Sequence, residues 1–152
     1  MKAGIQIEPD MILGTWRLVR TYRTLNGQPH LQDPLGMHAV GFAHYMPDGR
    51  VAILIANEGR QHLSGNRTGS PEAELAEAAR SFTGYCGTFT CGVDQVTHHL
   101  DVSSYENDNH TDYVRGASFD ADGLLTLETP QSPSPDGMRT MCLVWERQSR
   151  FG

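Results

Sequence analysis

Residues 81–104 read Ser81-Phe-Thr-Gly-Tyr-Cys-Gly-Thr-Phe-Thr-Cys-Gly-Val-Asp-Gln-Val-Thr-His-His-Leu-Asp-Val-Ser-Ser104. Alternating side chains stand on both sides of a short Gly-Val-Asp segment, which is typical of two antiparallel strands joined by a tight turn. We therefore predict a hairpin with strands over residues 83–92 and 95–103. Its second strand carries two adjacent histidines, and the rest of the chain adds similar strands around it.

The chain before this hairpin also shows strand patterns. The segment Pro47-Asp48-Gly49 places Pro and Gly where a tight turn needs them, between two stretches rich in apolar residues. Pro29 and Pro34 cannot donate hydrogen bonds to a strand ladder, so we predict a loop over residues 28–37. The predicted strands of this half cover residues 14–25, 38–46 and 50–56.

One helix interrupts the strands. Ser70 and Pro71 stand where an N-cap and a first helical residue are expected, and Ala and Leu then recur at helical spacing. This pattern predicts a helix over about residues 71–82. After the hairpin, a proline-rich connection over residues 129–137 precedes the last strand. The predicted strands of this second half cover residues 112–120, 124–129 and 138–147.

Eight short strands with one helix predict an all-β, eight-stranded, up-and-down antiparallel barrel that forms a single domain over residues 1–152. Closure into a barrel removes the exposed edges that a long meander would leave. A β-sandwich is the alternative that the strand pattern leaves open. A barrel of eight strands encloses either its own side chains or one small ligand.

Charge and composition exclude several classes of function. The net charge is -6 and the twelve Lys and Arg residues are scattered, so neither nucleic acid nor an anionic membrane is expected as a partner. The longest internal apolar run, residues 51–56, is far shorter than the ~20 residues that span a bilayer, and the N-terminus lacks a signal-peptide core. We expect a cytoplasmic protein that is a monomer or a homodimer.

Neither a metal nor a cofactor is expected. His98 and His99 are neighbours on one strand, so they point to opposite faces and cannot chelate one ion together. Binding of haem or a metal through His44, His98 or His110 stays open, although no Cys-x-x-Cys or His-x-x-x-His spacing supports it. We predict that the three cysteines, Cys86, Cys91 and Cys142, are free structural thiols.

Strand parity selects the candidate site. His98 shares its parity with Val96, Leu100 and Val102, which places His98 in the barrel cavity and His99 outside. Arg115 is of interest because an inward guanidinium needs a carboxylate from the protein or an anionic group of a ligand. The proposed catalytic residues are His98, Arg115 and Tyr85. The proposed ligand-binding residues, each on a strand where the opposite parity is also plausible, are Phe42, His44, Tyr45, Phe89 and Tyr113.

Several blocks that cover nearly the whole chain resemble the lipocalin-like domain family. The blocks are Gly14-Thr-Trp-Arg-Leu-Val19, Tyr45-Met-Pro-Asp-Gly-Arg-Val51, Gly84-Tyr-Cys-Gly-Thr-Phe89, Thr97-His-His-Leu100, Val114-Arg115, Leu124-Leu-Thr-Leu127 and Leu143-Val-Trp-Glu-Arg147. The resemblance implies a calycin-type barrel in which Trp16 closes one end and stacks with Arg147. It also permits enzymes, since such domains include tailoring enzymes of natural-product pathways.

Two functions follow from these residues. A histidine of near-neutral pKa beside a tyrosine and an arginine in a dry cavity suits proton abstraction next to a carbonyl. That chemistry belongs to a cofactor-free isomerase, cyclase or lyase acting on an apolar metabolite, and we favour it here. The alternative is a carrier or sensor that holds a hydrophobic or aromatic small molecule without converting it.

Overall fold

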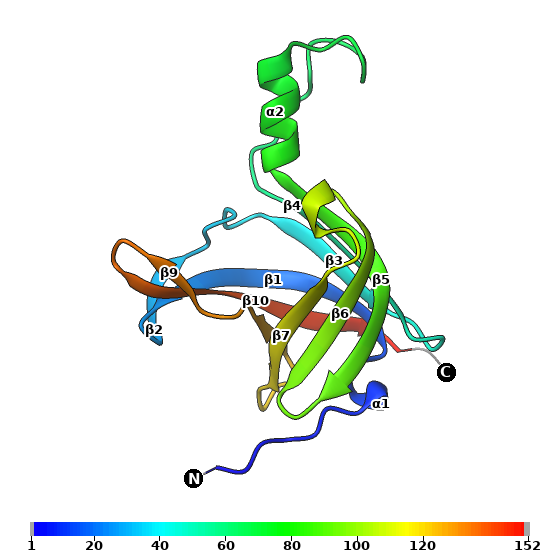
Figure 1. Cartoon of the computed structure of the whole chain (residues 1–152), viewed down its shortest axis with the longest axis vertical. Coiled ribbons are helices and arrows are strands. Elements are labelled where there is room, and N and C mark those ends of the chain that lie inside the picture. Colours follow the sequence, from blue (N-terminus) through cyan, green and yellow to red (C-terminus); the bar gives the residue numbers. More distant parts are fainter. Residues whose placement is uncertain (1, 151–152) are drawn as a thin grey trace.

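The computed structural model describes residues 2–150 and contains one antiparallel sheet of ten strands (Figure 1). The strand order is β2-β1-β3-β4-β5-β6-β7-β8-β10-β9, and β1 also pairs with β10, so the sheet closes on itself. The strands are β1 (Gly14–Leu25), β2 (Gln28–Gln32), β3 (Val40–Tyr45), β4 (Arg50–Ala56), β5 (Phe82–Gly92), β6 (Gln95–Ser103), β7 (Asp112–Phe119), β8 (Leu125–Glu128), β9 (Ser132–Ser134) and β10 (Gly137–Ser149).

Leaving out β2 and β9, the other eight of the ten strands form the predicted barrel. The prediction of a loop at 28–37 is wrong in part because β2 lies within it, and the proline-rich connection predicted at 129–137 contains β9. Both are edge strands, and an edge position tolerates Pro29 and Pro133 because no further strand needs their missing N–H.

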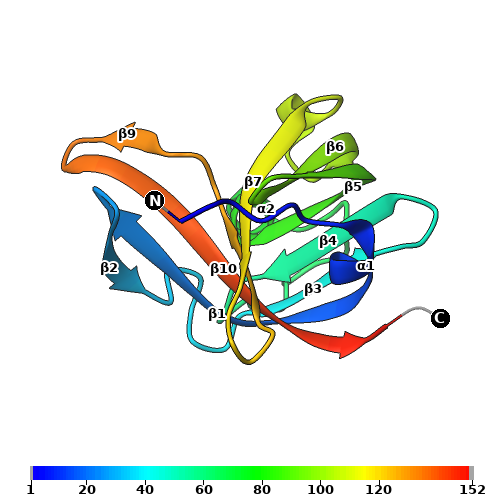
Figure 2. The same cartoon turned by 90° about the horizontal axis from the view of Figure 1, so that it is seen from below.

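These two edge strands extend the barrel on one side. Residues 14–17 of β1 pair with β3, whereas residues 22–25 pair with β2. In the same way, β10 pairs with β8 near its middle and with β9 at its start. The C-terminal end of β1 and the N-terminal end of β10 therefore leave the barrel together. Figure 2 shows these two ends with β2 and β9 as a protruding ribbon.

A short helix, α1 (Pro9–Ile12), closes the end of the barrel opposite α2 (Glu72–Arg80) (Figure 1). Trp16 is fully buried there, and its indole N–H donates to the carbonyl of Ile12 over 2.8 Å. The guanidinium carbon of Arg147 lies 4.2 Å from the centre of the Trp16 ring. Arg147 also donates to the carbonyls of Met11 and Leu13. The expected contact between Trp16 and Arg147 is present, and it joins the first strand to the last.

Helix α2 stands outside the barrel at the tip of the β4–β5 hairpin (Figure 1). It ends two residues earlier than predicted, and Ser70 does not cap it, because the Ser70 hydroxyl donates to the carbonyl of Asn66. No residue of α2 is buried. We call residues 57–81, which contain this helix and the loop before it, the arm. Among residues 2–150, no helix is long and apolar enough to cross a membrane.

Candidate functional site

The barrel encloses a cavity of about 220 Å³ in the half next to the arm. Ile55 near the end of β4 and Thr83 near the start of β5 place the cavity at this end, since the arm connects these two strands. Its walls are apolar or aromatic except for Thr83 and Arg115. The lining residues are Leu35, Ile53, Ile55, Thr83, Tyr85, Tyr113, Arg115, Leu127, Met141, Leu143 and Trp145.

His98 lies inside the barrel, as strand parity predicts, and is fully buried. Its Nε2 is 2.6 Å from the hydroxyl oxygen of Tyr45, and its Nδ1 is 2.8 Å from that of Tyr85. Tyr85 lines the cavity, whereas His98 and Tyr45 do not. His98 is therefore one step behind the cavity wall, with Tyr85 in between. His99 points outward and contacts Asp112 over 2.8 Å.

The expectation of a near-neutral histidine is not met. Burial lowers the pKa of the His98 imidazole from 6.5 to about 3, and the charges of Arg115 and His99 act in the same direction. His98 is therefore neutral at physiological pH. A neutral imidazole whose two nitrogens both hold tyrosine hydroxyls has no free lone pair with which to accept a proton from a ligand.

Arg115 on β7 reaches the cavity and is half-buried. Its guanidinium carbon lies 4.5 Å from the centre of the Tyr113 ring, and one of its nitrogens donates to the carbonyl of Val114 over 3.3 Å. Within residues 2–150, no carboxylate forms an ion pair with Arg115. The positive charge at the cavity is thus not neutralised by the described part of the chain.

Tyr113 joins the cavity to the loop after β6. Its ring packs edge-on against Tyr85, with ring centres 5.1 Å apart. Its hydroxyl donates to Asp108 in the short 3-10 helix η1 (Glu106–Asp108). Burial and this hydrogen bond raise the pKa of Tyr113 to about 12, so the phenol stays protonated. The hydroxyl proton of Tyr113 is therefore donated to Asp108 and is not free for a ligand in the cavity.

The other predicted ligand-binding residues do not line the cavity. Tyr45 and Phe89 are buried in the core, where their rings meet edge-on at 5.0 Å. The prediction of an inward position is wrong for Phe42 and His44. Burial alternates along β3 so that Ala43 and Tyr45 face inward, which leaves Phe42 and His44 stacked outside with ring centres 6.4 Å apart.

Trp145 is a lining residue that the sequence analysis did not select. It is 1% exposed, and among residues 2–150 its indole N–H has no hydrogen-bond partner. The signal was the alternation of Met141, Leu143 and Trp145 along β10, which share one face and line the cavity together. On this strand, the sequence analysis assigns a role only to Arg147.

No group of three His, Cys, Asp or Glu side chains in residues 2–150 is placed to hold a metal ion. The three cysteines, Cys86, Cys91 and Cys142, are free thiols, as predicted. Burial raises the pKa of Cys91 and of Cys142, so both are held in their neutral form.

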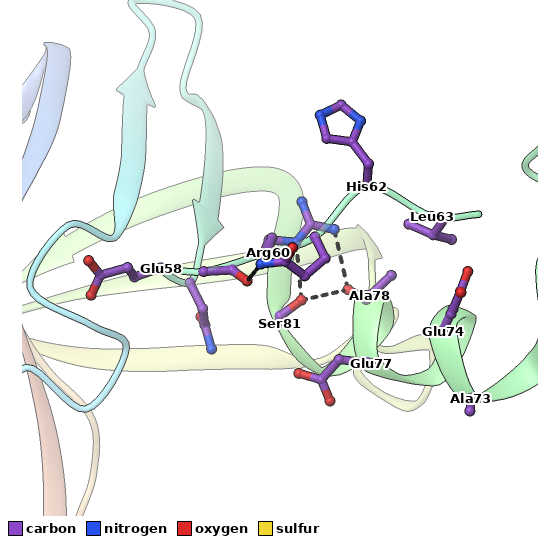
Figure 3. A pocket seen from close by; sticks show the side chains of 12 residues that line it. Glu58, Arg60, His62, Leu63, Ala73, Glu74, Glu77, Ala78 and Ser81 are labelled. Atoms are coloured by element: carbon purple, nitrogen blue, oxygen red, sulfur yellow. Dashed lines mark hydrogen bonds between the residues drawn. The ribbon is translucent and has the colours of Figure 1, made fainter. Parts of the chain in front are cut away.

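A second hollow of about 410 Å³ lies outside the barrel, between α2 and the loop over residues 57–63 (Figure 3). Figure 3 shows Arg60 turned toward Ser81 and Ala78, to which it donates over 3.1 and 3.4 Å. Ser64 likewise contacts Glu74. These polar groups satisfy one another, so the hollow is a crevice inside the arm. The barrel cavity, whose wall includes a guanidinium without an ion pair among the described residues, is the candidate site.

A comparison with protein families finds that residues 13–148 match the model of a lipocalin-like domain. The matched range begins just before β1 and ends within β10, so it covers the whole barrel. No protein of curated function shows significant similarity to the chain.

Proposed function

We propose that this chain, which belongs to the lipocalin-like domain family, binds a small and mainly apolar molecule in the cavity of its barrel. The observation that carries the proposal is the cavity itself, with apolar walls and a few polar groups, as in most ligand sites. Its volume is about 220 Å³, and an apolar cavity of about 150 Å³ already holds benzene. The site therefore has room for at least one ring.

Holding the ligand fits the site better than converting it. The buried imidazole of His98 is neutral, and hydrogen bonds to Tyr45 and Tyr85 occupy both of its nitrogens. Among the described residues, no Asp, Glu or free His lines the cavity as an alternative base. A carrier or sensor needs none of these groups, because apolar burial with a few oriented polar contacts supplies its affinity.

A cofactor-free isomerase, cyclase or lyase is the second candidate, and one observation favours it. Tyr85 lines the cavity together with Arg115, and its hydroxyl contacts the buried His98 over 2.8 Å. Such a phenol can donate a hydrogen bond to the oxygen of an enolate as charge develops there. In this mechanism Tyr85 is the group that touches the substrate, and His98 acts only through Tyr85.

Saturation-transfer NMR with three one-ring probes tests binding: phenylacetate, phenylacetamide and 2-phenylethylamine. The matched variants are Ile55→Phe, which fills the cavity, and Leu54→Phe, its exposed neighbour on the outer face. We expect at least one probe to bind the wild type and Leu54→Phe, and no probe to bind Ile55→Phe. Equal signals from both variants, or no binding to the wild type at millimolar concentration, would contradict the proposal.

Proton exchange in D₂O separates the two candidates. Phenylacetone is a one-ring ketone whose α-protons exchange through an enolate, and NMR follows their loss. An enzyme of the second class accelerates this exchange, and Tyr85→Phe removes the acceleration while the ketone still binds. A protein that binds phenylacetone without changing its exchange rate is a carrier or sensor for this class of compound.

A further inference from the structure

We infer that the ligand of the cavity presents a carboxylate, and that Arg115 receives it. The inference rests on the proposed function, because it concerns the molecule that the cavity holds. Arg115 carries it, and the lining residues Trp145 and Tyr85 bring further N–H and O–H groups to the same part of the barrel.

The first donor is the indole N–H of Trp145. An indole nitrogen can only donate, and a buried donor without an acceptor costs about 1–3 kcal/mol. Trp145 is 1% exposed, and its N–H is unpartnered in the described part of the chain. The other indole of the protein shows the usual solution, since Trp16 donates to a backbone carbonyl over 2.8 Å. The N–H itself is closed off from the cavity, so a ligand oxygen reaches it only when the wall around Trp145 adjusts.

The second donor is Arg115. A guanidinium has five N–H donors and no acceptor, and its planar fork matches a carboxylate. Only one bond, to a backbone carbonyl, involves this side chain within residues 2–150. The Tyr113 ring beneath it fixes the guanidinium at the cavity wall. The remaining donors are therefore available to a ligand.

The third donor is Tyr85, whose direction follows from its buried neighbours. Burial raises the pKa of Tyr45 and of Tyr85, so both phenols keep their protons. Tyr45 is fully buried, and its hydroxyl has only His98 Nε2 as an acceptor among the described residues. The neutral ring then carries its own proton on Nδ1 and donates it to Tyr85. The Tyr85 oxygen has thus accepted a hydrogen bond from His98, and its own proton has no acceptor among the described residues.

These donors select the charge of the ligand. No acidic side chain of residues 2–150 lines the cavity, so an ammonium group would meet Arg115 without a counter-charge. A carboxylate accepts two parallel bonds from a guanidinium and has lone pairs left for an indole or a phenol. A phosphate would bring up to two charges to a small site with one cation. A small carboxylate with an apolar body is the best match.

The test compares the three one-ring probes by calorimetry and follows the indole resonances by ¹H–¹⁵N NMR. We expect phenylacetate to bind at least tenfold more tightly than phenylacetamide, and 2-phenylethylamine to bind least. Phenylacetate should shift the Trp145 indole resonance, whereas the Trp16 resonance should stay in place because its N–H is already bonded to Ile12. Trp145→Phe assigns the two resonances.

Two variants then distinguish the loss of the Arg115 charge from a loss of the fold. Arg115→Gln should reduce the preference for phenylacetate over phenylacetamide to within about threefold, with an unchanged Trp16 resonance as proof of folding. Arg67→Gln, on the exposed arm, changes the net charge equally and should keep the full preference. Equal affinity for the acid and the amide, or tighter binding of the amine, would overturn the inference and leave the proposed function standing. Failure of every probe to bind would overturn the proposed function first.

Discussion

The imidazole of His98 ties the stability of the protein to pH. In the unfolded chain a histidine takes up a proton near pH 6.5, whereas burial lowers the pKa of folded His98 to about 3. The unfolded state therefore binds more protons between these two values, and acid favours unfolding. The stabilisation from a neutral His98 is complete above pH 6.5 and decreases as the pH falls toward 3.

We predict that the free energy of unfolding falls by up to about 1.4 kcal/mol per pH unit below pH 6.5 through this group alone. Urea titrations at pH 7, 6, 5 and 4 measure it. His98→Gln is the matched variant, because its amide can still bond both tyrosines but cannot titrate. The difference in stability between wild type and variant should shrink with acid. Parallel curves for the two proteins would show that folded His98 titrates normally.

Alternation along β6 was enough to place His98 inside and His99 outside. Local alternation could not reveal that the indole N–H of Trp145 lacks an acceptor. Whether an acceptor lies opposite this N–H depends on residues of other strands, which are far away in the sequence. The low pKa of His98 was hidden for the same reason. Burial by surrounding strands and the charge of Arg115 set it, and neither follows from local spacing.

At the scale of elements, the pairing of β5 with β6 contains a β-bulge that the alternation of side chains along the sequence did not reveal. Cys86 pairs with Val102 but the next residue, Gly87, pairs with Leu100, so Asp101 is an extra residue in β6. The parity of β6 therefore reverses, and Val102, expected beside His98 on the inner face, is 53% exposed. The bulge ends the inward run of β6 just before η1.

Gly87 is what allows the strands to approach at this bulge. A Cβ atom there would overlap the backbone carbonyl oxygen of His99, which cannot move without breaking the ladder. We predict that Gly87→Ala lowers the free energy of unfolding by at least 2–3 kcal/mol, in the range of changes that force backbone strain. Gly116→Ala is the control, since its nearest neighbour would be an ordinary 3.6 Å contact. Similar urea midpoints for the two variants would contradict this role of Gly87.

At the scale of the whole molecule, the number and spacing of the strands favoured the closed barrel that the structure shows, although they left a β-sandwich open. The protruding ribbon does not follow from the sequence pattern, because proline disfavours inner strands and yet is tolerated in edge strands such as β2 and β9. The two ends of the barrel differ in how they are filled. Trp16 and Arg147 fill the end at α1, and the end near the arm keeps the cavity.

The arm itself is an insertion in an otherwise ordinary hairpin. Ala56 and Phe82 pair in the ladder, and the N–H of Asn57 donates to the carbonyl of Ser81 over 2.9 Å. The two ends of the arm are therefore already neighbours. Its known ties to the barrel are few: Glu58 donates its N–H to the carbonyl of Leu35, and Arg60 lies 5.3 Å from the Phe82 ring centre.

We predict that the barrel folds without the arm when residues 58–80 are replaced by Asn-Gly, the preferred pair for a two-residue hairpin turn. The helical signal in circular dichroism should fall, while cooperative unfolding in urea persists with a loss of no more than about 2 kcal/mol, as expected for a few exposed contacts. Binding of phenylacetate should stay within about threefold, because among residues 2–150 a single hydrogen bond, from Glu58 to Leu35, joins the arm to a lining residue. A non-cooperative or aggregated variant would mean that the arm is part of the folding unit, and a folded variant without binding would mean that it holds the rim of the cavity in place.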